Sequence, residues 1–264
     1  MKTRIITAIV ALLVFIPILI FGDFELVFGI TLFNLATAVL SLVGVYEAVK
    51  CVGEHKKAYI LPIYICAFLL PLLTKNHLDT YTPVLLILVF YLFFAGVVSK
   101  GKLGADKLLS VFALAFYVTV SFGALTSLFY QGSIFFPLVF VGAWVTDTFA
   151  YFTGFFFGKH KLIPEVSPKK TVEGAIGGTL FASVGFAITA AIYGYGLKSI
   201  IVIAVVGIFA SIVSQFGDLS ASLVKRHFGI KDYGSLFPGH GGVLDRFDSI
   251  LAVSAFLYAT SLLI

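Results

Sequence analysis

Charged side chains are scarce in this sequence. They make up 12% of its 264 residues, while 60% are hydrophobic, against roughly 45–50% in an average soluble domain. A soluble chain of this length could bury a large core, but it would still need a charged surface around that core. The composition therefore excludes an ordinary soluble globular protein and favours a membrane protein.

Cysteine is also rare, and the common phosphate-binding loop of nucleotidases is missing. Cys51 and Cys66 are the two cysteines, too few for a disulfide framework or a cysteine metal site. No GxxxxGK[ST] segment occurs, so a P-loop nucleotidase is not indicated. The net charge of +5 is better explained by cytoplasmic loops that meet anionic lipid than by nucleic acid, and we expect no nucleic-acid partner.

Long apolar runs are what the sequence has instead. A helix needs about 17–25 residues to cross a bilayer, and continuously apolar runs favour helices over a barrel of alternating strands. We therefore expect one all-α membrane domain, residues 1–264, with few motifs in residues 1–130 and the catalytic segments in residues 134–264. Nine runs have about the required length: 5–21, 26–49, 58–73, 82–98, 108–130, 134–158, 171–195, 199–224 and 249–264.

The basic residues indicate an orientation for these nine helices. If the N-terminus lies inside, all of the 18 lysines and arginines except Lys75 and Lys198 fall in segments on the inner side. This asymmetry follows the positive-inside rule. We therefore predict nine transmembrane helices in the cytoplasmic (inner) membrane, with a cytoplasmic N-terminus and a C-terminus outside.

Polar residues that need an explanation gather in three groups in the second half of the chain. In the first group, an aspartate inside a span costs a few kcal/mol unless it is paired, hydrated or bound to a cation. Asp147 is therefore either a cation ligand or the partner of a neighbouring helix, while the glycines nearby are explained by close helix packing. The residues that share this helical face are Trp144, Asp147, Tyr151, Gly154 and Gly158.

The second group is a basic loop, residues 158–174. Ser167 followed by Pro168 predicts a helix N-cap with proline at the first helical position. A helix N-terminus suits phosphate, and Lys169 and Lys170 add two positive charges there. An ordinary cytoplasmic basic loop is the alternative.

The third group, residues 215–248, is the most informative. On a helix its first part presents oxygen ligands and, one to two turns later, cationic side chains on the same face. Asp245 and Asp248 are three residues apart and can share a second face, while the glycine-rich residues 239–242 can form an anion nest. The first face consists of Gln215, Asp218, Ser222, Lys225 and Arg226.

Together the three groups predict one partly submerged site at the cytosolic face. Carboxylates without a cysteine or a histidine pair favour a hard cation, above all Mg²⁺. Mg²⁺ beside lysines and arginines favours phosphate-bearing substrates. An ion-coupled transporter is the alternative from a different class, but it predicts inverted repeats and a site near the bilayer midplane, and no repeat is visible.

The third group also resembles the phosphatidate cytidylyltransferase family. The resemblance rests on S-x-V-K-R, K-D-x-G and F-P-x-H-G-G-V-x-D-R-F-D, which occur in this order within residues 222–248, with support from residues 144–158 and 167–178. It implies a homodimeric membrane enzyme that needs Mg²⁺ and makes CDP-diacylglycerol from CTP and phosphatidate. A second cation, or a CTP-dependent enzyme that acts on an ether lipid or a polyprenol, stays an alternative.

This interpretation gives each polar residue an expected role. The catalytic residues are Asp218, Asp245, Lys225 and Arg226. The cation ligands are Asp218 and Asp245, with Asp147, Asp248 and Gln215 as further or supporting ligands. The residues expected to bind substrate are Ser167, Lys169, Lys170, Ser222, Lys231, His240, Gly241, Gly242 and Arg246. For His240 we expect loop structure or a hydrogen bond to phosphate rather than general-base catalysis, because a phosphate nucleophile is already anionic at neutral pH.

Overall fold

The structure is a computed structural model of residues 1–264, and it describes all of them except residues 1, 28, 56–57, 75–80, 101–103 and 264. The orientation prediction used Lys56, Lys57, Lys75 and Lys102, which lie outside the described residues. The chain divides into two compact units. The first consists of Met1–Tyr130 and Ile230–Arg246, and the second of Gln131–Gly229 and Phe247–Ile264.

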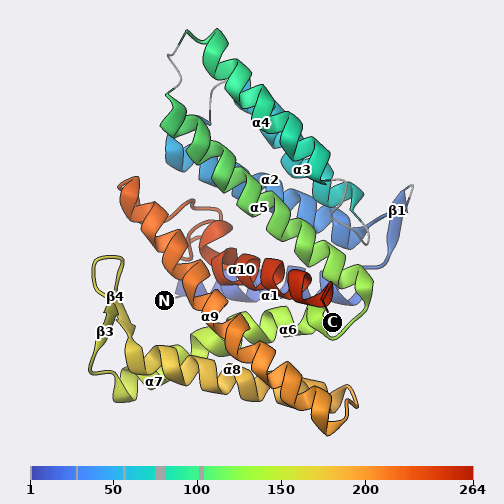
Figure 1. Ribbon diagram of the computed structural model, residues 1–264, viewed down its shortest axis with the longest axis vertical. Coiled ribbons are helices and arrows are strands. Elements are labelled where there is room, and N and C mark those ends of the chain that lie inside the picture. The colour runs from blue at the N-terminus through green and yellow to red at the C-terminus, as the bar shows by residue number, and fades with distance from the viewer. Residues whose placement is uncertain (1, 28, 56–57, 75–80, 101–103, 264) are drawn as a thin grey trace. The chain divides into compact units, whose positions relative to one another are not determined.

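The first unit is helical apart from one short hairpin and the loop that ends it (Figure 1). Its second helix, α2, begins at a capping box in which Thr31 and Asn34 each accept a hydrogen bond from the other's backbone N–H. It ends at Gly53, whose φ of 84° lets the chain leave the helix. Its elements are α1 (Lys2–Ile20), β1 (Glu25–Val27), β2 (Ile30–Thr31), α2 (Leu32–Val52), the 3₁₀ turn η1 (Ala58–Ile60), α3 (Leu61–Leu73), α4 (Tyr81–Val98) and α5 (Ala105–Gln131).

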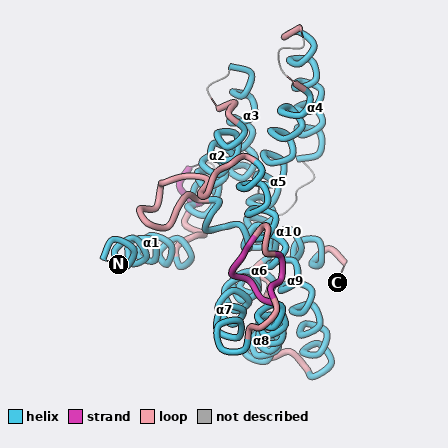
Figure 2. The backbone as a smooth tube through the Cα atoms, turned by 90° about the vertical axis from the view of Figure 1, so that its left-hand side faces the viewer, coloured by secondary structure: helices cyan, strands magenta, loops and turns pink. Residues whose placement is uncertain are grey.

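The second unit is centred on α8, which packs along both α7 and α9. The glycines allow this close approach, because a Cβ at Gly174 would collide with the carbonyl oxygen of Ala150 and would crowd Cα of Gly154. Close helix packing is therefore confirmed as the reason for Gly154. The elements are α6 (Phe135–Phe140), the π-helical turn η2 (Val141–Val145), α7 (Thr146–Phe157), β3 (Lys161–Ile163), β4 (Ser167–Thr171), α8 (Val172–Ile192), α9 (Leu197–His227) and α10 (Leu244–Ser261). The strands form the magenta hairpin beside α7 and α8 in Figure 2.

Helices are found along each of the nine predicted runs in the described part of the chain. The second helix starts at Leu32 rather than near residue 26, because residues 25–27 and 30–31 pair as a β-hairpin. Among the described residues, six helices are long and apolar enough to cross a membrane by length and composition: α2, α4, α5, the continuous segment Phe135–Phe157, α8 and α9. An all-α, multi-pass membrane protein fits these helices, while the ninefold count and the orientation stay predictions.

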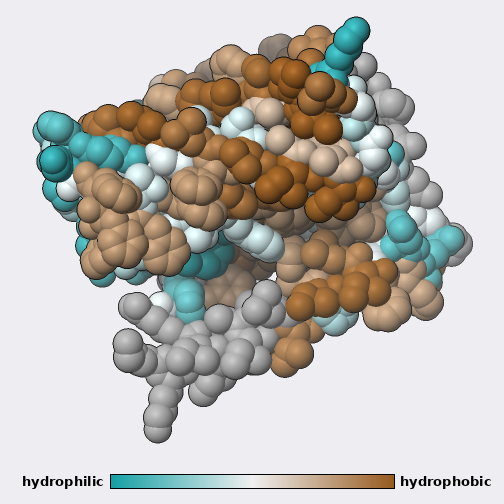
Figure 3. Space-filling view, turned by 90° about the horizontal axis from the view of Figure 1, so that it is seen from below, coloured by the Kyte–Doolittle hydropathy of each residue, from teal (hydrophilic) through white to brown (hydrophobic). Residues whose placement is uncertain are grey.

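Apolar side chains face outward on these helices. Leu180, Ile188 and Ile192 on α8, and Val205 and Phe209 on α9, are exposed, and apolar residues form broad bands on the face drawn in Figure 3. Burying such surface needs lipid or a partner, because a soluble monomer rarely exposes large apolar patches. The exposed faces therefore fit a chain solvated by hydrocarbon.

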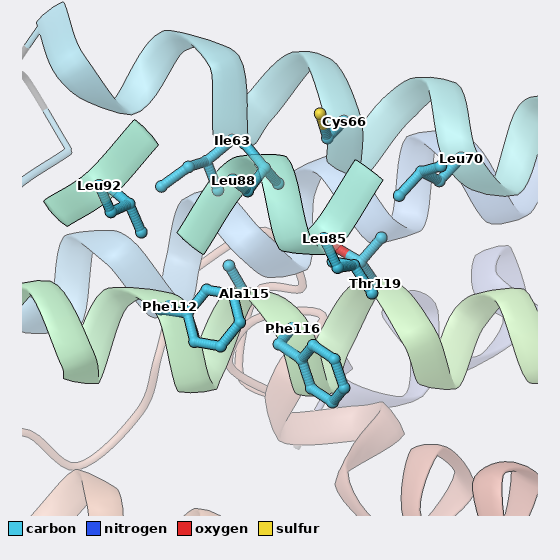
Figure 4. Close-up of a pocket in the computed structure, with 10 residues that line it drawn as sticks. All are labelled: Ile63, Cys66, Leu70, Leu85, Leu88, Leu92, Phe112, Ala115, Phe116 and Thr119. Atoms are coloured by element: carbon cyan, nitrogen blue, oxygen red, sulfur yellow. The ribbon is translucent and has the colours of Figure 1, made fainter. Parts of the chain in front are cut away.

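One apolar pocket lies within the first unit, between α3, α4 and α5 (Figure 4). Cys66 and Thr119 supply the polar atoms among the ten residues drawn, and none of the ten is charged. Cys66 and Cys51 are both free thiols. This pocket has no group that could bind a phosphate, so the chemistry must be sought elsewhere.

Candidate functional site

Three helices bring carboxylates into one neighbourhood of the second unit. Asp218 comes from α9, Asp147 from the first turn of α7, and Asp248 from the first part of α10. Asp248 lies within electrostatic reach of both other carboxylates and of Lys225. Ser249 links two of them, since its hydroxyl donates to Oδ2 of Asp147 at 3.3 Å and its backbone N–H donates to Oδ1 of Asp248 at 2.8 Å. The structure thus brings three of the five predicted cation ligands near one another.

A lysine from the hairpin reaches this cluster. Nζ of Lys170, on β4, lies 2.6 Å from Oδ2 of Asp218, and the two side chains are 24% and 29% exposed. The predicted phosphate ligand and the predicted cation ligand are thus paired with each other. The two side chains are partly exposed, while Nζ of Lys170 is itself buried.

A glycine lets α9 and α10 approach each other at the cluster. A Cβ at Gly217 would collide with Cβ of Ala252 and crowd the carbonyl oxygen of Asp248. Gly217 immediately precedes Asp218 in α9, so the same close contact sets the separation of the two aspartate-bearing segments. Backbone proximity, rather than a long flexible side chain, brings these carboxylates together.

The amide of Gln215 serves the packing of α8 against α9. Its Nε2 donates to Oγ1 of Thr179 at 3.1 Å and to the carbonyl oxygen of Ala175 at 3.3 Å. Ser211 extends this buried network, accepting a hydrogen bond from the hydroxyl of Thr146 at 2.9 Å. These hydrogen bonds make Gln215 a link between α8 and α9, and they leave Oε1, the amide atom that can bind a cation, unaffected.

The predicted helix start at Ser167 is wrong. Residues 167–171 form β4, which pairs with β3 so that Ser167 lies opposite Ile163. The N-cap of α8 is Thr171, whose hydroxyl accepts the backbone N–H of Gly174. Pairing of the two strands satisfies the backbone groups that a helix through Pro168 would have used, so the helix begins four residues later.

The base of this hairpin is closed by Glu173. Its carboxylate accepts the backbone N–H groups of Lys159 and His160 and contacts Nδ1 of His160 at 2.6 Å. The carboxylate occupies the first turn of α8, where a negative charge is favourable. Glu173 therefore ties the strand before the turn to the helix after it, and holds β4 where Lys170 reaches Asp218.

The glycine-rich loop of the first unit is organised by a second set of contacts. Oδ2 of Asp245 accepts the backbone N–H of Tyr233 at 2.8 Å and that of Gly242 at 2.9 Å. Gly241 has a φ of 86°, a conformation that L side chains rarely adopt. Asp245 and Asp248 both lie near the start of α10. Asp245 thus has a structural task in the loop that bears it.

Comparison with known proteins decides the family. The model of the cytidylyltransferase family matches residues 2–264. The chain is 34% identical over 255 residues to a phosphatidate cytidylyltransferase of Staphylococcus haemolyticus and 35% identical over 260 residues to one of Staphylococcus aureus, each covering 96% of both chains. A phosphatidate cytidylyltransferase of Bacillus subtilis is 32% identical over 268 residues, which cover 98% of this chain and 96% of that one. The chain belongs to the cytidylyltransferase family.

The remaining predicted residues of this cytidylyltransferase differ in exposure. Lys225 is buried and close to the Asp248 charge, so it can act on an anion that enters the cluster. Ser222 and His240 are half-buried. The cationic side chains that are exposed are Lys169, Arg226, Lys231 and Arg246.

Sequence reasoning missed four residues that hold the family's motif segments in place. Thr171 and Glu173 were passed over because the helix was expected to start at Ser167. Ser249 was taken as the first residue of an apolar span. Glu47 was missed although it is the one charged residue in the apolar run 26–49, and an intramembrane carboxylate is a reason to look for a partner.

The carboxylate cluster fits a hard cation by the chemistry of its donors. No group of three Asp, Glu, His or Cys side chains in the described part of the chain is arranged closely enough to hold a metal on its own. Mg²⁺ is ordinarily held by one or two carboxylates together with water and substrate phosphates. The cytidylyltransferase site therefore suits a cation that arrives with a phosphate-bearing substrate.

Proposed function

We propose that this chain transfers the cytidylyl group of CTP to phosphatidate, giving CDP-diacylglycerol and pyrophosphate. The observation that carries the proposal is the cluster of Asp147, Asp218 and Asp248 beside Lys170 and Lys225, in a chain that belongs to the cytidylyltransferase family. The relatives named as phosphatidate cytidylyltransferases support the choice of substrates. The ion-coupled transporter finds no such support.

In the proposed reaction a phosphate oxygen of phosphatidate attacks the α-phosphorus of CTP, and pyrophosphate leaves. The attacking phosphate monoester has a second pKa near 6, so it is already anionic at neutral pH and needs no strong general base. The principal barrier is repulsion between two polyanions, which cationic side chains reduce by positioning and charge neutralisation. Lys170 and Lys225 are placed to do this, and Arg226 suits a bidentate contact with phosphate.

We also propose that the reaction requires Mg²⁺. Asp218 and Asp245 are the proposed ligands, with Asp147, Asp248 and Oε1 of Gln215 as further or supporting groups. Bound there, Mg²⁺ would neutralise phosphate charge and favour departure of pyrophosphate. The ion pair between Lys170 and Asp218 supports this assignment, because it places a carboxylate directly beside a cationic side chain that suits phosphate.

The proposal places the protein in the cytoplasmic membrane with this site facing the cytosol, where CTP is found. The distribution of lysine and arginine supports that orientation. The remaining substrate-binding assignments, namely Ser167, Lys169, Ser222, Lys231, His240, Gly241, Gly242 and Arg246, stay predictions. The homodimer also stays a prediction, which light scattering of the purified protein in detergent tests.

A single assay tests the function. Purified protein is incubated with radiolabelled CTP and either phosphatidate, an ether-linked phosphatidate analogue or a polyprenyl phosphate, with and without Mg²⁺, and the lipids are separated by thin-layer chromatography. We expect a labelled product that migrates as CDP-diacylglycerol from phosphatidate, together with pyrophosphate. Label that enters only one of the other lipids, or none of them, would refute the proposed substrate.

A further inference from the structure

The first unit contains a buried carboxylate that the proposed reaction does not use. Glu47 lies in α2 and is 4% exposed. An ionised carboxylate in such surroundings costs several kcal/mol unless it finds hydrogen-bond donors. Its partners therefore indicate why the chain retains it there.

Those partners belong to the glycine-rich loop and to the start of α10. The carboxylate of Glu47 accepts the backbone N–H of Val243 at 3.1 Å and that of Leu244 at 3.0 Å. The first N–H groups of a helix have no acceptor within the helix, and negative charge is favourable at that end. Glu47 thus acts as an N-terminal cap supplied from a distant part of the sequence.

Two glycines of the loop enclose the same carboxylate. A Cβ built on Gly234 or on Gly242 would overlap Oε1 of Glu47. Neither glycine has a positive φ, so the requirement for glycine at both positions is one of space rather than of backbone conformation. The loop is therefore wrapped around the Glu47 side chain.

The loop held in this way carries Asp245. The backbone N–H of Gly242 donates to Asp245, while its Cα packs against Glu47. Glu47 and Asp245 lie within electrostatic reach of each other, and Lys50 of α2 offsets part of their repulsion. The position of Asp245 thus depends on a fold of the loop that Glu47 fixes.

We propose that Glu47 is a positioning residue for cytidylyl transfer, which holds residues 230–246 so that Asp245 is presented to the substrates. This rests on the proposed function. Glu47 itself touches no reacting atom. Its removal lowers turnover because a displacement of about 1 Å at a reacting group can reduce the rate about a hundredfold.

The first test uses Glu47→Gln, which keeps the shape but replaces one acceptor oxygen with an N–H₂ group that cannot accept the helix N–H. We expect kcat to fall about tenfold or more, with the concentration of Mg²⁺ for half-maximal activity raised. The matched control is Glu54→Gln. Glu54 is equally buried in the same unit, but its partners are Tyr59 and Lys107, so this variant should lose thermal stability while keeping its kcat.

The second test exploits the crowding at Gly234. Gly234→Ala should lower kcat, because the new methyl group displaces the carboxylate. Combining it with Glu47→Asp, which shortens the side chain by one methylene, should restore part of that loss. Gly196→Ala is the control, because a Cβ there meets nothing within 4 Å and should leave kcat unchanged.

The outcomes are separable from a failure of the proposed function, which would show as an inactive wild-type protein. With active wild type, a Glu47→Gln variant that retains more than about half of its kcat overturns the positioning role. Equal losses in Glu47→Gln and Glu54→Gln at equal melting temperatures overturn it as well. If Glu47→Gln fails to fold, the Gly234 series decides: losses in the double variant that simply multiply would refute the proposal, and recovery would support it.

Discussion

Asp218 is the carboxylate whose replacement separates catalysis from folding most cleanly. Asp245 also holds the glycine-rich loop through two backbone N–H groups, so its replacement would disturb structure and chemistry together. Asp218, by contrast, forms an ion pair with Lys170. Asp218→Asn removes the charge and one acceptor oxygen, and it leaves the volume of the side chain almost unchanged.

The cost of this change to the fold can be estimated from the ion pair. At 2.6 Å the Coulomb attraction is about 1.6 kcal/mol in the dielectric of water and about 6 kcal/mol at an effective dielectric of 20. Both side chains are about a quarter exposed, but Nζ of Lys170 is itself buried. Removing the charge of Asp218 should therefore cost about 1–2 kcal/mol, between the values for an exposed and a fully buried ion pair. A loss of this size leaves a stable protein folded.

The cost to catalysis should be much larger. If Asp218 helps to hold Mg²⁺ against the phosphates of CTP, we expect Asp218→Asn to lower kcat at least about a hundredfold, equivalent to about 2.7 kcal/mol of lost transition-state stabilisation. This exceeds what the ion pair contributes to stability, so unfolding cannot account for it.

The assay is release of pyrophosphate at saturating CTP and phosphatidate, with melting temperature measured on the same preparations. Lys107→Met is the control, because it breaks the ion pair between Lys107 and Glu54, far along the chain from any proposed ligand. Lys107→Met should lower the melting temperature by about as much as Asp218→Asn does, and it should leave kcat unchanged. An Asp218→Asn variant that keeps its kcat within about threefold of wild type would remove Asp218 from the catalytic site.

Three further predictions concern the supports of the site and its cation. Thr171→Ala should reduce the free energy of unfolding by about 1 kcal/mol because α8 loses its cap, whereas Thr171→Ser should be neutral in thermal denaturation; equal melting temperatures for both variants would contradict the capping role. Gly217→Ala should destabilise the protein by about 1–3 kcal/mol through overpacking, and adding Ala252→Gly should recover part of this loss. A double variant whose loss of stability equals the sum of the two single losses would contradict the close contact. Chelation with EDTA should abolish CDP-diacylglycerol synthesis and added Mg²⁺ should restore it, so full turnover in EDTA would exclude the cation.

The helices could be predicted because the thickness of a bilayer sets the length of an apolar run, whatever the neighbouring helices do. The second helix was misplaced at its start because the capping box of Thr31 and Asn34 follows a hairpin that apolarity does not reveal. The helix after the basic loop was misplaced for a similar reason. Ser167-Pro168 has the local pattern of a helix start, but pairing with β3 outweighs that local preference.

The site was predictable to the extent that chemistry is local in the sequence. The three polar groups were expected to share one site because their basic loops all fall on the predicted inner side, and in the second unit Asp147, Asp218 and Asp248 do lie near one another. The role of Gln215 in helix packing could not be predicted, because its amide donates to a residue of α8 and the sequence of α9 does not indicate that partner. The π-helical turn before Asp147 is likewise absent from the pattern, although it alters the register that relates Trp144 to Asp147.

The motif residues therefore divide into those that meet ligands and those that hold the loops. A spaced pattern of charged residues and glycines suggests that each of them contacts substrate. Gly234 and Gly242, however, are explained by the space that the carboxylate of Glu47 in α2 requires. Asp245 accepts hydrogen bonds from backbone N–H groups of its own loop. In the second unit the corresponding support comes from Gly217 and Glu173. These backbone contacts fix the segments that carry the lysines and aspartates, which is the rigid support that a preorganised site requires.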